Sequence, residues 1–122
     1  MAAPNIVNVS SIYGRTVGAT LTSTLTTGHL TCATDKVLKI NSIVVSNIDV
    51  TNSAEVTVSF YDASATTNYA LISTVVVPTD STLVVLAKDS AIYLEEGDEI
   101  RAGSTTGSDS QIIISYEELD DA

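Results

Sequence analysis

Apolar and polar residues alternate with a period of two along most of this chain. The clearest case is residues 55–61, where Val56, Val58 and Phe60 share one side of the run and mostly polar residues share the other. This pattern is typical of a strand with one buried face. We expect these three side chains in the core, and Phe60→Ala is expected to cost about 3–5 kcal/mol if Phe60 is buried.

The run at residues 36–48 is predicted to be another strand. Its expected core positions share one parity: Leu38, Ile40, Val44 and Ile48, with Ser42 between them. On the other parity, Lys39 and Asn41 are expected to face water.

Further along, residues 69–77 end at Pro78, which cannot donate a hydrogen bond to a ladder. A tight turn at 78–81 then leads into residues 82–87, so the two runs are predicted to form a hairpin. Short strands follow at 91–94, 99–102 and 111–116. The last six residues, EELDDA, are expected to be a frayed acidic tail.

These runs amount to eight or nine short strands separated by turn residues, and no segment has a helical period. The chain is therefore predicted to be all-β, a single antiparallel β-sandwich of the jelly-roll or immunoglobulin-like kind. Residues 1–34 are rich in Thr and Ser and are expected to supply an extended N-terminal arm and the first strands. Residues 35–122 are expected to form the sandwich body with its short acidic tail.

Composition changes the picture in two ways. Val (14 residues) and Ile (11) must build most of the core, because only six residues are aromatic. The net charge of −10 would repel phosphate backbones, so nucleic acid is not an expected partner.

No apolar run approaches the ~20 residues of a membrane-spanning helix, so no membrane partner is expected either. The opening residues lack the pattern of a signal peptide, and the initial Met suggests a complete gene product.

Candidate chemistry is sparse. Cys32 is the only cysteine, so no intrachain disulfide can form, which fits assembly in a reducing cytoplasm. His29 is the only histidine and has no nucleophile motif to serve, so it is interpreted as a surface or packing residue, with a pH-sensitive subunit contact as the alternative. Together, His29 and Cys32 could complete a zinc site only by shared symmetry. We interpret Cys32 as a small buried hydrophobe.

The densest group of carboxylates is Glu95, Glu96, Asp98 and Glu99. Its order does not match a calcium loop, so we interpret it as an acidic turn. A carboxylate pair for glycoside hydrolysis would need one acid in a pocket that raises its pKa. No aromatic platform for a sugar is evident either, because Trp is absent. We therefore expect no enzyme activity, no catalytic residue, no cofactor and no metal site. The best candidates for a sugar platform are Tyr13, Tyr61 and Tyr69, which are more readily explained as ordinary strand or loop residues.

Residues 36–63, 77–102 and 112–119 together resemble small virion structural proteins of tailed phages that infect marine cyanobacteria, and the opening MAAPNIVNVSSIYGRT is similar too. The most distinctive parts are YLEEGD at 93–98, followed by Ile100 and Arg101, and SYEE at 115–118. The resemblance implies a component of the virion, assembled in the host cytoplasm, without fixing its place on the capsid, neck or tail.

Three classes of function stay open at this point. The favoured class is a non-enzymatic virion protein, with a capsid decoration (cement) protein ahead of a neck, tail or fibre component. Its expected partners are its own copies, as a homotrimer or similar ring with the arm crossing between subunits, and a major capsid or tail protein. The alternative is a fibre module that recognises a host receptor or glycan. A hydrolase is the least favoured.

Overall fold

The structure is a computed structural model that describes residues 11–120. This part of the chain contains nine strands and one short 3-10 helix, and no α-helix. In chain order the elements are β1 (Ser11–Thr20), β2 (Thr27–Thr31), β3 (Lys36–Asn47), β4 (Ala54–Asp62), β5 (Thr67–Val77), β6 (Thr82–Leu86), η2 (Lys88–Ser90), β7 (Ile92–Leu94), β8 (Glu99–Ser104) and β9 (Ser110–Asp120).

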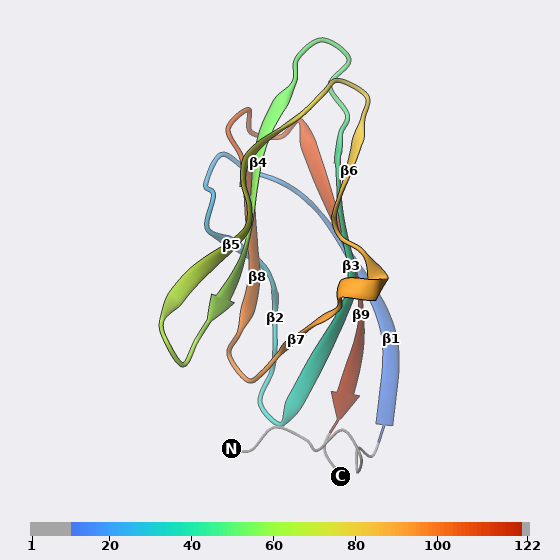
Figure 1. Cartoon of the computed structure of the whole chain (residues 1–122), viewed down its shortest axis with the longest axis vertical. Helices are drawn as coiled ribbons and strands as arrows, with labels where there is room; N and C mark the ends of the chain where they lie inside the picture. Colours follow the sequence, from blue (N-terminus) through green and yellow to red (C-terminus); the bar gives the residue numbers. More distant parts are fainter. Residues whose placement is uncertain (1–10, 121–122) are drawn as a thin grey trace.

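The strands form two stacked antiparallel sheets, seen on opposite sides of the molecule in Figure 1. Sheet A has the order β1-β9-β3-β6, and the three-residue β7 also pairs with β3. Sheet B has the order β2-β8-β4-β5. The predicted all-β sandwich and its strand count are therefore confirmed.

The strand order decides between the two kinds of sandwich that the sequence left open. Most consecutive strands lie in different sheets, and β4 and β5 form the one hairpin between consecutive strands of the described residues. With the short β7 set aside, eight strands are divided between two four-stranded sheets in the order of a jelly roll. Two Greek keys are thus wound together, and β9, the last described strand, lies inside sheet A between β1 and β3.

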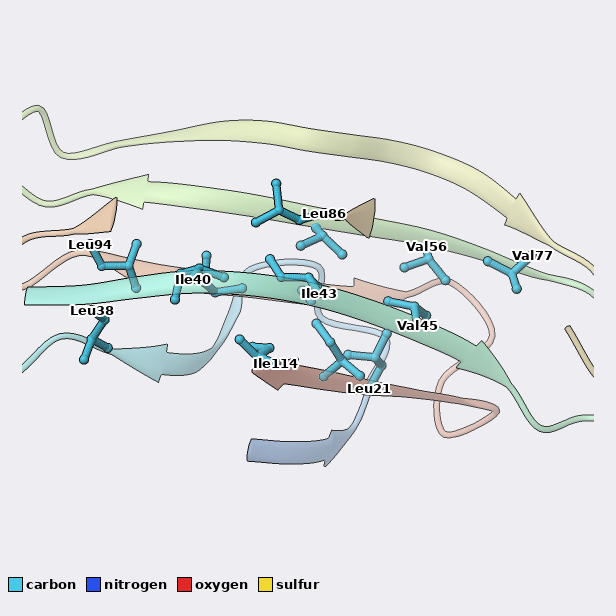
Figure 2. Packing of buried hydrophobic residues seen from close by; sticks show 14 of the residues in the cluster. Leu21, Leu38, Ile40, Ile43, Val45, Val56, Val77, Leu86, Leu94 and Ile114 are labelled. Atoms are coloured by element: carbon cyan, nitrogen blue, oxygen red, sulfur yellow. The ribbon is translucent and has the colours of Figure 1, made fainter. Parts of the chain in front are cut away.

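The core fills the space between the sheets and is almost wholly aliphatic. Figure 2 shows side chains from both sheets meeting there, including Ile40, Ile43 and Ile114 from sheet A and Val56 from sheet B. All four are fully buried. Leu21, just after β1, joins them, since the chain crosses between the sheets at that point (Figure 2). Interdigitated β-branched side chains of this kind suit a sandwich core about 10 Å thick.

The predicted inward face of residues 36–48 is correct for the first half and wrong for the second. Leu38 and Ile40 are buried, but Val44 is only partly buried and Ile48 is 52% exposed. The register with β9 shifts between Ile40 and Ser42, so Asn41 is the extra residue of a β-bulge. A bulge reverses the alternation beyond it. The side chains that enter the core after it are therefore those of Ile43 and Val45.

The predicted hairpin of 69–77 with 82–87 is also wrong. β5 pairs with β4 in sheet B, whereas β6 pairs with β3 in sheet A. Asn47 holds both sides of the turn that crosses between the sheets: its backbone NH donates to Ser81 O (2.9 Å), and its buried amide donates to Val77 O (3.0 Å). A turn signal marks where a strand ends, but not which sheet the chain enters next.

The acidic end of the chain is not a frayed tail over its described part. Residues 117–120 continue β9, which lies between β1 and β3 and pairs with both. Two basic side chains offset the charge: Glu118 contacts Arg15 (3.5 Å) and Lys36 (3.4 Å), and Lys36 also contacts Asp120 (3.1 Å). These carboxylates raise the pKa of Lys36, chiefly through the hydrogen bond to Asp120. Residues 121–122 lie outside the described part.

The sequence zone at 1–34 contributes one edge strand to each sheet. β1 pairs with β9 and β2 pairs with β8. The loop between them packs closely on Gly103 of β8, where an added Cβ would lie 2.6 Å from Leu25 Cα. The predicted arm before residue 11 lies outside the described residues.

Candidate functional site

An aromatic hollow opens on the side of the sandwich where β5 and β7 lie at the edges of their sheets. It encloses about 190 Å³ and its lining is apolar: Phe60, Tyr69, Ala70, Leu71, Ile92 and Tyr93. Phe60 and Tyr69 face each other across the β4–β5 ladder, with ring centroids 6.5 Å apart and ring planes inclined by 22°. The two rings therefore form a stacked pair at the rim of the core.

The hollow exists because β7 is short. Only Ile92, Tyr93 and Leu94 pair with β3 there, so sheet A does not cover the β5 side of the sandwich fully. As a result Phe60, which the alternation places inward, is only partly buried. Tyr69 and Tyr93 are 53% and 45% exposed. The stability cost of Phe60→Ala should therefore fall below the range expected for a fully buried ring.

The three tyrosines considered as a sugar platform do not come together. Tyr13 lies on β1, in sheet A, and the Arg15 guanidinium carbon is 5.2 Å from its ring centroid. On β4, Tyr61 is covered by Arg101 at 3.6 Å, a cation–π contact. Tyr69 alone of the three lines the hollow. Its neighbours there, Phe60 and Tyr93, lie 9 and 24 residues away in sequence, and no local pattern connects such positions.

The carboxylates of Glu96, Asp98 and Glu99 make contacts within the fold. Asp98 is buried and accepts hydrogen bonds from the backbone NH groups of Ala63 and Glu95, both at 3.0 Å. Glu96 accepts from the Asp35 NH (2.8 Å), and Glu99 pairs with Arg101 (3.0 Å). The interpretation as an acidic turn accounts for each of these contacts. In residues 11–120 no group of three His, Cys, Asp or Glu side chains is arranged to hold a metal ion.

His29 and Cys32 both make contacts within the fold. The ring of His29 is partly buried, with Nε2 3.1 Å from Ala102 O. Cys32 is 2% exposed, and its Sγ donates to Lys36 O at 3.1 Å. Burial raises the pKa of the Cys32 thiol to about 11, so the thiol is neutral and poorly nucleophilic at neutral pH.

Large apolar side chains are exposed on several sides of the molecule. The strand pairing places Ile113 and Val84 with Val44 in one row across the outer face of sheet A. Elsewhere, Val76 is exposed on β5, and Ile48 and Val50 are exposed in the β3–β4 loop. Tyr69 and Tyr93 are exposed at the hollow. Such side chains are therefore not concentrated at one site.

The comparisons with known proteins add little. No known protein family and no curated protein matches the sequence. Among solved structures, the chain is similar to a Bacillus endospore appendage, described as belonging to a novel family of disulfide-linked pili, with 15% sequence identity, a TM-score of 0.49, and coverage of 92% of this chain and 88% of that one. So distant a similarity says nothing about what this chain does. No helix in residues 11–120 is long and apolar enough to cross a membrane.

Proposed function

We propose that this protein is a non-enzymatic structural subunit of a tailed-phage virion, present in many copies and associated with copies of itself. Its favoured place is on the capsid, as a decoration protein bound to the major capsid protein. The sequence resemblance to small virion proteins of cyanophages supports the phage context.

One observation carries the proposal: exposed apolar side chains lie on the outer face of sheet A, on β5, in the β3–β4 loop and at the aromatic hollow. A module that binds one ligand needs one binding surface, whereas a subunit of a lattice meets neighbours on several sides. The jelly roll, which presents these side chains on different sides, fits the second role, although a fold alone does not define a function.

Quantitative mass spectrometry of purified particles tests this proposal. The expected result is a copy number that is a simple fraction or multiple of that of the major capsid protein. Particles that lack this chain should assemble but break more readily on heating. A chain absent from washed particles would contradict the proposal, and a stoichiometry matching the tail tube would move it from the capsid to the tail.

The aromatic hollow favours a second candidate, a fibre or tail module that binds a glycan. A stacked Phe60–Tyr69 pair with Tyr93 opposite could hold the apolar face of a sugar ring. If this is its role, the isolated chain should bind host cells, and Tyr93→Ala should abolish that binding. Tyr13→Ala is the matched control, because Tyr13 is a similarly exposed tyrosine on β1.

A further inference from the structure

Four of the five strands at the edges of the sheets carry features that discourage pairing with another chain, and the shortest of them, β7, has only three residues. β2 and β6 have only five residues each, and the ladder that each forms contains a register shift. β5 is long, but its ladder with β4 shifts twice, and Thr74 has a φ of +47°. Short length and bulges are common means of protecting an edge.

The fifth edge strand, β1, has none of these features. Its ten residues pair with β9 in one unbroken register, from Ser11↔Asp120 to Thr20↔Gln111. The strand contains no Pro, and its one charged residue is Arg15. That guanidinium contacts Glu118 and lies over the Tyr13 ring, so its charge is partly offset. A long, regular and nearly uncharged edge is the kind that pairs with another strand.

The hydrogen-bonding pattern between β1 and β9 determines which backbone NH and C=O groups of β1 face away from β9. Leu21 NH donates to Ser110 O at 2.8 Å, directly after the last paired residue of β1. In an antiparallel ladder, residues whose backbone groups face the partner alternate with residues whose groups face away. The NH and C=O groups at positions 12, 14, 16, 18 and 20 therefore point to the edge of the sheet. Glycine occupies two of these positions, and a Cβ on Gly14 would meet nothing within 4 Å.

Charge favours a second copy as the occupant of this edge. The chain carries −10 overall, so most pairs of surfaces on two copies repel each other. Residues 1–34 contain no Asp or Glu, so two β1 strands can approach without placing carboxylates of their own strands against each other.

We propose that β1 pairs antiparallel with β1 of a second copy about a two-fold axis at Thr16, which joins two A sheets into one continuous sheet. This register uses all five outward-facing positions of both strands and gives about ten backbone hydrogen bonds. It sets Gly14 against Gly18, and Ile12 against Thr20.

In this register, a side chain of the second copy would lie beside a second hollow. This one encloses about 300 Å³ beside β1 and is lined by Gly18, Ala19, Thr20, Gln111, Ile112 and Ile113. Ile12, which is exposed on β1, would lie next to it across the axis. The inference rests on the proposed function, because it supplies the self-association that a repeating subunit needs.

Two substitutions at Thr16 test the pairing in the full chain. Thr16→Lys places a charge at the axis and should convert the dimer to a monomer in sedimentation velocity, with an unchanged circular dichroism spectrum. Thr82→Lys, at an exposed position of edge strand β6 in the same sheet, is the matched control and should leave the dimer intact. Thr16→Cys should form a disulfide-linked dimer under mild oxidation, because Cα atoms about 5.5 Å apart lie within disulfide reach. The buried Cys32 does not compete in that reaction.

The possible failures are distinguishable. A Thr16→Lys chain that associates like the wild type overturns the β1 pairing, while self-assembly and the proposed function stand. The wild type could instead be a trimer that Thr16→Lys dissociates, while Thr16→Cys forms no disulfide link. That outcome overturns the two-fold register in favour of the ring expected from the sequence. A wild-type chain that stays monomeric overturns the pairing, and the copy number in particles then decides the proposed function separately.

Discussion

Two neighbouring isoleucines on β9 show how strongly the position of a residue determines its contribution to stability. Ile114 is fully buried between the sheets, whereas Ile113, on the opposite face of the same strand, is 47% exposed. Chemically identical side chains one residue apart thus have different surroundings. The alternation of the strand is the whole cause.

Ile114→Ala should therefore lower the free energy of unfolding by about 2–5 kcal/mol, because it leaves a cavity in a close-packed core. Ile113→Ala is the matched control and should change stability by at most about 0.5 kcal/mol. Urea unfolding of both variants measures the difference. Similar losses for the two would mean that the face assignment of β9 is wrong.

Cys32 allows a test of burial by pH. The pKa of its thiol is raised by burial to about 11, above the value of about 8.5 for a free cysteine. Since the folded state holds the proton more tightly, this contribution to stability is full below about pH 8.5 and is lost as pH rises toward about 11. A thiol reagent at pH 8 should react slowly with the native chain and rapidly in denaturant. The Cys32→Ala variant should lose less stability than the wild type as pH rises toward about 11, because it lacks this thiol. Fast labelling of the native wild-type chain would contradict the burial of Cys32.

At the scale of elements, a close approach between two segments requires glycine at position 103. The loop after β1 crosses Gly103, and the atoms nearest to a Cβ there are backbone atoms of residues 24 and 25, which cannot rotate away. Gly103→Ala should cost about 1–3 kcal/mol through overpacking. Gly14→Ala, which meets open space, should be neutral or slightly stabilising in thermal unfolding. An equal response at the two positions would contradict the packing of this loop.

The turn between β4 and β5 depends on one carboxylate. Asp62 Oδ1 accepts from Ser64 Oγ (2.7 Å) and from the Ser64 NH (3.0 Å), and these bonds lower the pKa of Asp62. A lowered pKa stabilises the fold above the unfolded value of about 3.9 and loses this effect as pH falls through the folded value. Asp62→Ala should therefore unfold at a lower temperature than the wild type at pH 7, and the gap should close under acid conditions. A gap that persists at pH 2 would mean that the carboxylate charge is not its cause.

At the scale of the whole molecule, the net charge opposes the edge pairing that we propose. Two copies of charge −10 repel each other, while the β1 strands that we propose to pair carry no acidic residue. Salt screens the repulsion and leaves backbone hydrogen bonds largely unaffected. The dimer should therefore tighten as ionic strength rises, in sedimentation experiments at fixed protein concentration. Dissociation by salt would instead indicate a contact held by ion pairs.

The sequence alone determined that this chain is all-β, because alternation and turn residues act over a few neighbours and are visible in one strand at a time. It also indicated the inward side of Val56 and Val58 and the packing role of Cys32. Only the tertiary structure decided which sheet β6 joins, where Asn41 reverses the faces of β3, and that Phe60, Tyr69 and Tyr93 line one hollow. The same holds for the contrast between β1 and the other edges. Each of these depends on which strand lies alongside which, and pairing between distant segments leaves no local periodicity to detect.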